Sequence, residues 1–376
     1  MNPQEQLRDS VQKSGIRTIK VVSWRDLDDP EAGGSEIHAD QILSRWAAAG
    51  LDVVSRTSAV PGRATKVERN GYRVERFGGR YSVFPDVVRR GFLRDARKYD
   101  AVVEIWNGMP FFSPLWFHRK RLILLHHVHG EMWQLTLPGT LGSLGWTLEH
   151  QVAPLVYRRS QIATLSTSSA EEIHERLGLK HVAIVPPGIS EFFSVGGRRD
   201  DSPLVVAVGR LVTVKRFDAL IDHFAQVRQH VPNARLVIAG EGYLRTELEA
   251  QVESLGARDW IELPGRVSDE DLRDLYRRAW LVTSASLREG WGMSLTEAAA
   301  CGTPSVAVDI AGHRDAVAQG RSGLLVADDE LANGIVELLV DSDRLESFRR
   351  GALEWAAELS WDNSALRLFE LLQSSR

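Results

Sequence analysis

Two series of short apolar segments that alternate with amphipathic segments constrain the fold of this chain most strongly. Residues 17–24 have the composition of a strand, residues 35–49 that of an amphipathic helix, and residues 52–55 that of a second strand. Such a βαβ unit places its two strands parallel in one sheet. The same alternation starts again at residues 203–209. The sequence therefore predicts an α/β chain built on parallel sheets.

The length of 376 residues favours two domains, because a single hydrophobic core of that size is uncommon. Proline and glycine punctuate residues 186–188, and the run 196–201 is rich in glycine and charged residues, which is typical of a linker. We expect an N-terminal domain over residues 1–190 and a C-terminal domain over residues 200–360.

The composition excludes several classes of protein. Hydrophobic residues make up 43% and charged residues 26% of the chain, as in globular proteins. The net charge of −4 gives no reason to expect a nucleic-acid partner, and the single cysteine, Cys301, excludes an internal disulfide and a cysteine-based metal site. The sequence has no signal-peptide h-region and no run of about 18 apolar residues, so we expect a cytoplasmic protein.

The segment 288–304 joins a glycine-containing loop to the start of a helix. Gly292 lets backbone amides approach an anion closely, and the helix predicted from Ser294 ends before residue 304. A glycine-rich loop that leads into a helix N-terminus is typical of a phosphate site. Glu289 and Glu297 are better suited to hydroxyl groups than to phosphate, so they indicate sugar or ribose hydroxyls beside it. The alternative is that both are ordinary solvated glutamates.

Two further loops carry residues suited to an anion. Arg210 and Lys215 follow the predicted strand 203–209 and can clamp a diphosphate, although they can also be solvated loop cations. Gly33 and Gly34 precede the helix at 35–49 and form either a second anion site or a tight turn.

The three-glycine fingerprint of dinucleotide-binding sites is absent. It does not follow the first strand, and the pair Gly240 and Gly242 lacks the third glycine, where Arg245 stands. Both observations count against a nicotinamide-dependent enzyme.

Histidines cluster at the end of the predicted strand 122–126, at His126, His127 and His129. Alternation along the strand aims His127 and His129 to the same side, and sites in α/β proteins form at the carboxyl ends of parallel strands. No further spaced metal ligands accompany them, so we predict site residues without a metal and favour His129.

Residues 63–121 are strongly basic, with 14 Lys and Arg against 6 Asp and Glu. They include a predicted helix at 87–98 and aromatic residues at 111–117. Basic and aromatic residues together suit docking on an anionic membrane surface. A core helix with basic flanks explains the same pattern.

The motifs occur in the order that characterises one family. They occupy residues 33–36, 127–131, 209–215 and 264–270, followed by Glu289 and Glu297 with seven residues between them. In these motifs the chain resembles the retaining glycosyltransferases of family 4. The resemblance implies the GT-B fold of two facing Rossmann-like domains with an active site between them, and a terminal segment, about 361–376, that packs back on the N-terminal domain.

The resemblance also implies roles for the candidate residues. Arg210 and Lys215 would hold the donor diphosphate. Further donor contacts would come from Gly33, Gly34, Gly292, Met293, Ser294 and Leu295. Glu297 would accept hydrogen bonds from the ribose and Glu289 would contact the donor sugar, while Val267 would touch the base through its backbone.

On the same grounds His129 would orient the sugar and the acceptor, with His127 and Glu131 close to the sugar or the acceptor. No metal or cofactor is implied. The predicted function is transfer of a hexose from GDP-mannose or a UDP-sugar to a lipid or saccharide hydroxyl, in cell-envelope or polysaccharide synthesis. The alternatives are a nucleotide-sugar epimerase of the same fold and a non-catalytic protein that binds sugar nucleotides.

Overall fold

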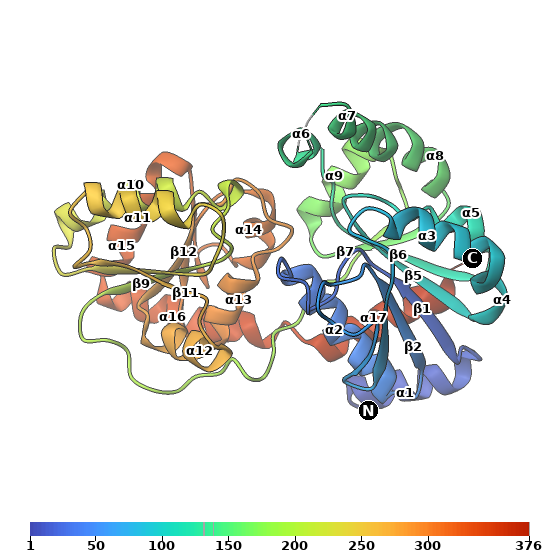
Figure 1. Cartoon of the computed structure of the whole chain (residues 1–376). Coiled ribbons are helices and arrows are strands. Elements are labelled where there is room, and N and C mark those ends of the chain that lie inside the picture. The colour runs from blue at the N-terminus through green and yellow to red at the C-terminus, as the bar shows by residue number, and fades with distance from the viewer. Residues whose placement is uncertain (131, 138, 376) are drawn as a thin grey trace. The chain divides into compact units, whose positions relative to one another are not determined.

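The computed structural model describes residues 1–130, 132–137 and 139–375. The chain forms two compact units, which are coloured by residue number in Figure 1. Unit 1 comprises Met1–Gly188 and Ser360–Arg376, and unit 2 comprises Ile189–Leu359. Each unit is a mainly parallel sheet covered by helices on both faces, which confirms the predicted α/β class.

The sheet of unit 1 has, in the described residues, eight strands in the order β3-β4-β2-β1-β5-β6-β7-β8. The strands are β1 (Thr18–Val22), β2 (Asp52–Thr57), β3 (Lys66–Arg69), β4 (Tyr72–Arg76), β5 (Ala101–Asn107), β6 (Lys120–His127), β7 (Gln161–Thr164) and β8 (Val182–Ile184). β3 pairs antiparallel with β4, and the other neighbours pair in parallel. The strand order reverses between β1 and β5, which is where ligands bind in open α/β sheets.

Helices from distant parts of the chain cover one face of this sheet, namely α1 (Pro3–Ser14), α2 (Gly34–Ala48) and α17 (Trp361–Ser374). The remaining segments are α3 (Val83–Arg90), η1 (Gly91–Asp95), α4 (Ala96–Lys98), α5 (Ser113–Trp116), α6 (Met132–Thr136), α7 (Thr140–Thr147), η2 (Leu148–Val152), α8 (Ala153–Tyr157) and α9 (Thr167–Leu177). The indole N–H of Trp46 donates to the carbonyl of Ala365 at 2.9 Å, which ties α17 to α2.

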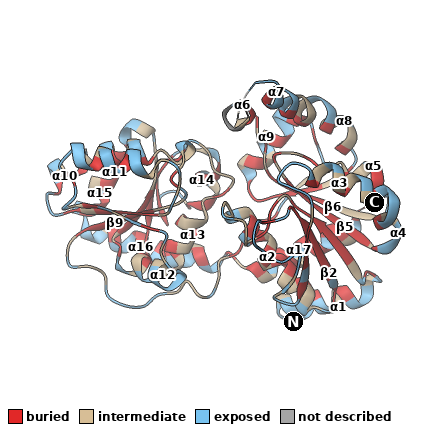
Figure 2. Cartoon of the chain, viewed as in Figure 1, coloured by how far each residue is buried: buried red, intermediate tan, exposed pale blue. Residues whose placement is uncertain are grey.

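The sheet of unit 2 has the order β11-β10-β9-β12-β13-β14 in the described residues, with all neighbours parallel. Its strands are β9 (Leu204–Val208), β10 (Arg235–Ala239), β11 (Ile261–Gly265), β12 (Leu281–Ser284), β13 (Ser305–Val308) and β14 (Gly323–Val326). Here the strand order reverses between β9 and β12. The strands of both sheets are largely buried, as expected for parallel sheets covered on both faces (Figure 2).

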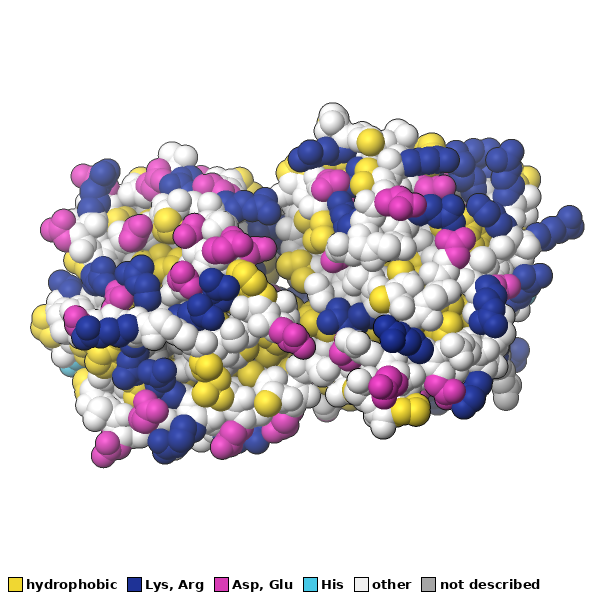
Figure 3. All heavy atoms as spheres, turned by 90° about the horizontal axis from the view of Figure 1, so that it is seen from below, with side chains coloured by type: hydrophobic (Ala, Val, Ile, Leu, Met, Phe, Trp, Pro, Cys, Tyr) yellow, Lys and Arg dark blue, Asp and Glu magenta, His cyan; other side chains and the backbone are white. Residues whose placement is uncertain are grey.

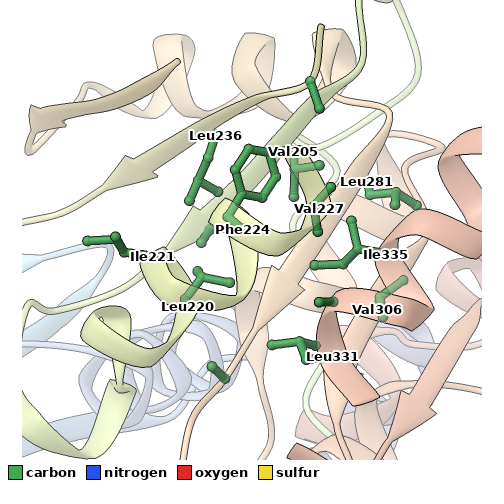
Figure 4. Packing of buried hydrophobic residues seen from close by; sticks show 14 of the residues in the cluster. Val205, Leu220, Ile221, Phe224, Val227, Leu236, Leu281, Val306, Leu331 and Ile335 are labelled. Atoms are coloured by element: carbon green, nitrogen blue, oxygen red, sulfur yellow. The ribbon is translucent and has the colours of Figure 1, made fainter. Parts of the chain in front are cut away.

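Helices α10 (Phe217–His230), α11 (Arg245–Ser254) and α15 (Leu331–Val340) cover one face of the second sheet, and α12 (Asp269–Arg278), α13 (Met293–Ala300) and α16 (Ser342–Ala357) cover the other. The shorter segments are η3 (Thr213–Lys215), α14 (Ala311–Ala316) and η4 (Asp328–Glu330). Phe224 of α10 and Ile335 of α15 pack on Val205 and Val306 of the sheet, as Figure 4 shows. This core fixes the ends of β9 and β12, which carry the candidate site.

One local expectation is wrong, and another, the helix at 87–98, is confirmed with a different start. The run 196–201 is not a linker but part of unit 2, because Asp200 pairs with Arg235 at 2.6 Å and with Arg278 at 2.9 Å. The helix expected at 87–98 begins at Val83 and contains the π-helical turn η1. Among the described residues, no helix is both long and apolar enough to cross a membrane.

Candidate functional site

Most of the predicted residues of unit 2 lie at the carboxyl ends of β9 and β12, where the strand order reverses. Arg210 follows β9, and Glu289 lies in the loop between β12 and α13. The backbone N–H of Leu287 donates to the carbonyl of Val214 at 2.9 Å, which joins the two loops. Loops that leave a parallel sheet in opposite directions at this point form the usual ligand site of such sheets.

Two glycines hold the loop that carries Arg210. A Cβ added at Gly240 would lie 1.9 Å from the carbonyl oxygen of Gly209, and one at Gly242 would lie 2.2 Å from that of Leu211. The N–H of Leu211 donates to the carbonyl of Glu241 at 2.9 Å. Gly240 and Gly242 do not form a dinucleotide-binding fingerprint. Their role is to let their own backbone segment approach the loop that carries Arg210 closely.

Lys215 and Glu289 form an ion pair, and the hydroxyl of Ser286 donates to Glu289 at 2.8 Å. Burial alone raises the pKa of Glu289, but the charge of Lys215 and these hydrogen bonds together hold the pKa below its usual value. Arg210, by contrast, is exposed, and its guanidinium has no ion-pair partner among the described residues. The site thus presents one cation paired with a carboxylate and one that faces solvent.

Behind Glu289 lie two residues that the sequence analysis did not single out. A Cβ added at Gly312 would lie 2.4 Å from the carbonyl oxygen of Glu289, so only glycine allows this contact. His313 is fully buried and donates from Nδ1 to the carbonyl of Val308 at 2.7 Å. The signal that could have found them is their position, since a glycine and a histidine follow the strand β13 closely.

Helix α13 begins at the predicted glycine turn. Gly292 has a φ of 113°, which a residue with a side chain rarely adopts. The N–H of Leu295 already donates to the carbonyl of Gly292 at 3.0 Å. Within the described chain, this leaves the first-turn amides of Met293 and Ser294 without an internal acceptor, as at any helix start.

Glu297 lies in α13 and accepts a hydrogen bond from the hydroxyl of Tyr276 at 3.2 Å. Burial raises the pKa of Glu297 to about 7, and the charge of Asp269 adds to this effect. Asp269 begins α12, two residues after Val267, so Val267 and Glu297 belong to the same part of unit 2. At neutral pH the carboxyl group of Glu297 is near the midpoint of its titration.

If Glu297 accepts from a ribose hydroxyl as the resemblance implies, its pKa predicts that affinity for a nucleotide sugar falls as the pH is lowered through 7. A ribose hydroxyl donates better to the ionised carboxylate, so binding must remove the proton from Glu297 below its pKa. We expect about tenfold weaker binding at pH 6 than at pH 8. Titration calorimetry measures this change in affinity. A nucleotide sugar is the suitable ligand because its diphosphate has no terminal phosphate that would itself titrate in this pH range. Glu297→Gln should flatten the profile, and an unchanged profile in that variant would refute the assignment.

In unit 1, Gly33 and Gly34 stand at the start of α2, next to the reversal between β1 and β5. The N–H of Gly33 donates to Glu36 at 2.8 Å, and Asn107 at the end of β5 donates to the hydroxyl of Ser35 at 3.0 Å. Gly33 has an extended backbone, and a Cβ added there would meet nothing within 4 Å. Neither the backbone nor packing within the chain therefore requires glycine at this position.

If Gly33 contacts the donor phosphates as the resemblance implies, Gly33→Ala is expected to impair transfer without harming the fold. The added methyl group would then obstruct the donor, and we expect about a tenfold loss of kcat/KM, on the order of 1.4 kcal/mol. Stability should stay equal or rise slightly, because alanine lowers the entropy of the unfolded chain. Steady-state kinetics and thermal unfolding test both expectations, and full activity in Gly33→Ala would exclude a ligand contact at this turn.

The three histidines at the end of β6 and after it differ in position, as expected from alternation along the strand. His126 is buried, with its Nε2 3.1 Å from Nδ1 of His38. The rings of His127 and His129 lie on the same side, with their centroids 5.8 Å apart. Glu131, the other candidate here, lies outside the described residues.

Comparisons with known proteins match both halves of the chain. Residues 188–355 match the family described as Glycosyl transferases group 1, and residues 32–191 match Glycosyltransferase Family 4. Mannosylfructose-phosphate synthase of Agrobacterium fabrum is 34% identical over 199 residues, which cover 47% of this chain and 43% of that protein. The GDP-mannose-dependent alpha-(1-6)-phosphatidylinositol monomannoside mannosyltransferase of Mycobacterium tuberculosis is 31% identical, over 47% of this chain and 49% of that protein.

The matched segments thus span about half the length of these curated relatives. Among solved structures, sucrose-phosphate synthase of Thermosynechococcus elongatus has a TM-score of 0.79 at 21% identity, covering 94% of this chain and 98% of that chain. HepE of Anabaena in complex with UDP and glucose has a TM-score of 0.75 at 18% identity, covering 95% and 100%. At such identities the structural likeness establishes the fold.

Proposed function

Because the chain belongs to the glycosyltransferases of group 1 and family 4, with the GT-B fold, we propose that it transfers a hexose from a nucleotide-diphosphate sugar to a hydroxyl acceptor. The anomeric configuration is retained. The observation that carries the proposal is the convergence of exposed Arg210 and the Lys215–Glu289 pair where the strand order of unit 2 reverses.

The residues of unit 2 hold the donor. Arg210 and Lys215 stabilise the diphosphate as negative charge grows on the leaving group, and the amides of Met293 and Ser294 add donors to the same phosphates. These groups supply the positive charge that a bound metal ion would otherwise provide beside the diphosphate. Glu297 accepts from the ribose hydroxyls, and the backbone at Val267 contacts the base.

Glu289 accepts a hydrogen bond from the hexose. In unit 1, Gly33 and Gly34 approach the phosphates, and His129, with His127 beside it, orients the hexose and the acceptor hydroxyl. The bond between the anomeric carbon and the phosphate oxygen breaks as the acceptor oxygen bonds on the same face. The leaving phosphate takes the proton of the acceptor, so no carboxylate nucleophile is required.

We propose GDP-mannose as donor ahead of a UDP-sugar, and a lipid or saccharide acceptor of cell-envelope or polysaccharide synthesis. The mycobacterial relative is named as GDP-mannose-dependent, which favours the guanosine nucleotide, whereas HepE was solved with UDP-glucose.

A thermal-shift screen of the full chain against nucleotide sugars, followed by turnover with the stabilising donor, tests the proposal. A donor at 100 times its dissociation constant should stabilise the fold by about 2.7 kcal/mol. Glycoside formed with an added hydroxyl acceptor is the expected result. Epimerised donor without acceptor would instead identify an epimerase, and binding without any turnover a sugar-nucleotide-binding protein.

One surface of unit 1 is suited to docking on a membrane, which agrees with a membrane-bound acceptor. Much of the positive charge of residues 63–121 is paired within the fold, for example Arg76 with Asp26 and Arg90 with Asp86. Figure 3 shows basic side chains gathered toward the right-hand edge of the view, on unit 1.

A smaller part of this region presents apolar and basic side chains together. Phe92 and Leu93 of η1 are 60% and 68% exposed, and Leu115 of the adjoining α5 is 49% exposed. Arg94 and Arg97 are exposed beside them. We propose that these five residues, called the η1 surface, dock on the anionic inner face of the cell membrane, because apolar side chains flanked by cations match anionic lipid.

Flotation with vesicles of phosphatidylglycerol and phosphatidylcholine checks this docking. The wild-type chain should float with them at low salt and be released at high salt. Phe92→Ser combined with Leu93→Ser should weaken binding on the order of tenfold or more. Leu255→Ser, at an exposed leucine of unit 2, is the control and should bind normally. Failure of the wild-type chain to bind at low salt would refute the proposal.

A further inference from the structure

A buried carboxylate, Glu149, holds the loop that carries His129. Glu149 lies in η2, between α7 and α8, and is fully buried. Its carboxylate accepts hydrogen bonds from the backbone N–H of His129 at 2.8 Å and of Gly130 at 3.0 Å. A third comes from the indole N–H of Trp133 at 2.9 Å. One side chain thus fixes the backbone on both sides of the His129 carbonyl and the indole that follows.

Trp133 extends this constraint to the imidazole ring of His129. The rings of Trp133 and His129 meet edge to face, with centroids 4.6 Å apart. Two glycines on one face of α7 make room for Trp133: a Cβ at Gly145 would lie 2.4 Å from its indole ring, and one at Gly142 would lie 2.9 Å from its backbone carbonyl oxygen. Trp133 is therefore enclosed between α7 and His129, and the ring of His129 has one wall set by it.

Packing alone does not account for a carboxylate here. Burial raises the pKa of Glu149, and the hydrogen bonds from His129, Gly130 and Trp133 act in the opposite direction. A buried carboxylate costs stability unless it is fully hydrogen-bonded, and an apolar side chain would fill the same volume without that cost. The π-helical turn η2 that carries Glu149 is likewise rare and tends to occur at functional sites.

We infer that Glu149 is a positioning residue for the transfer step, which fixes the backbone at His129 and Gly130 and, through Trp133, the plane of the imidazole. The inference rests on the proposed role of His129 at the hexose. Since unit 2 holds the nucleotide in that proposal, loss of Glu149 should slow the chemical step and leave nucleotide binding unchanged.

A double-mutant cycle on the full chain tests this inference. Glu149→Gln keeps the shape but replaces one acceptor oxygen with an NH₂ group that faces the N–H donors. We expect kcat to fall about 10- to 100-fold, with nucleoside diphosphate affinity unaltered. In a His129→Ala background the same change should cause little further loss, because the residue that it positions is already gone.

Glu104 provides a matched control. It is also fully buried in unit 1 and accepts from the backbone N–H of Phe111 and Ser113 and from the hydroxyl of Tyr157. Glu104→Gln should lower stability without coupling to His129→Ala. If Glu149→Gln does not fold, Trp133→Phe removes a single donor and should show the same coupling with a smaller loss of kcat.

An equal fractional loss of kcat in both His129 backgrounds, or no loss at all, would overturn the positioning role of Glu149. A wild-type chain that binds nucleotide sugars but transfers nothing would overturn the proposed function itself. The two failures are therefore distinct.

Discussion

Arg210→Ala is expected to reduce kcat/KM for transfer by about 10²- to 10³-fold. Arg210 is the exposed cation of the site, and within the described residues its guanidinium forms no ion pair, so alanine removes diphosphate stabilisation without leaving a buried charge unpaired. The loss should appear in kcat as well as in KM, because negative charge on the diphosphate increases in the transition state. Steady-state kinetics with the donor found by thermal shift measure it.

Arg258→Ala is the matched control for this change. Arg258 is also exposed in unit 2, and it pairs with Glu253 outside the loops of the site. It should retain wild-type kinetics, and both variants should unfold at the wild-type temperature within about 2 °C, since surface substitutions rarely change stability by more than about 0.5 kcal/mol. Wild-type turnover in Arg210→Ala would remove the diphosphate clamp from the account.

Glu289→Gln is expected to lower kcat about 10²-fold while nucleoside diphosphate affinity stays the same or increases. The glutamine keeps the shape of the side chain but removes the charge that pairs with Lys215 and that, in the proposed function, accepts from the hexose hydroxyl. Release of Lys215 from this pair leaves it free to bind phosphate, which is why affinity and turnover should change in opposite directions. Kinetics combined with calorimetry separate the two quantities.

Glu358→Gln serves as the control, because Glu358 pairs with Arg321 at 3.0 Å on the surface of unit 2. It should change neither quantity. Should Glu289→Gln lose nucleotide affinity and turnover to the same extent, Glu289 would act on the nucleotide and not on the hexose.

The fold was predictable where local pattern decides it. Buried parallel strands such as β9 and β10 are continuous apolar runs, and Ser268 caps α12 by accepting from the N–H of Asp271, as its sequence indicates. The π-helical turns η1 and η2 were not predicted, because no sequence pattern distinguishes them from an α-helix. Helix α1 was missed since it buries only Leu7 and Val11 along a polar segment.

The candidate site divides in the same way. Short sequence motifs contain Arg210, Glu289, Glu297 and Gly292, and the neighbouring residues in each motif indicate its chemistry. The residues that support them are not indicated in this way, because Tyr276 and Gly312 reach the site only through the packing of separate strands and helices. Glu149 is 20 residues from His129 in sequence, and only the fold of unit 1 brings the two together.

The measurement that tests the central claim most directly is calorimetric titration of the full chain with a nucleoside diphosphate and with the matching nucleoside. Guanosine and uridine, each with its diphosphate, cover the two donor bases. If Arg210, Lys215 and the start of α13 bind the phosphates, the diphosphate should bind far more tightly than the nucleoside, and Arg210→Ala should remove most of that difference. Equal affinity for nucleoside and diphosphate, or a difference that survives in Arg210→Ala, would contradict the account.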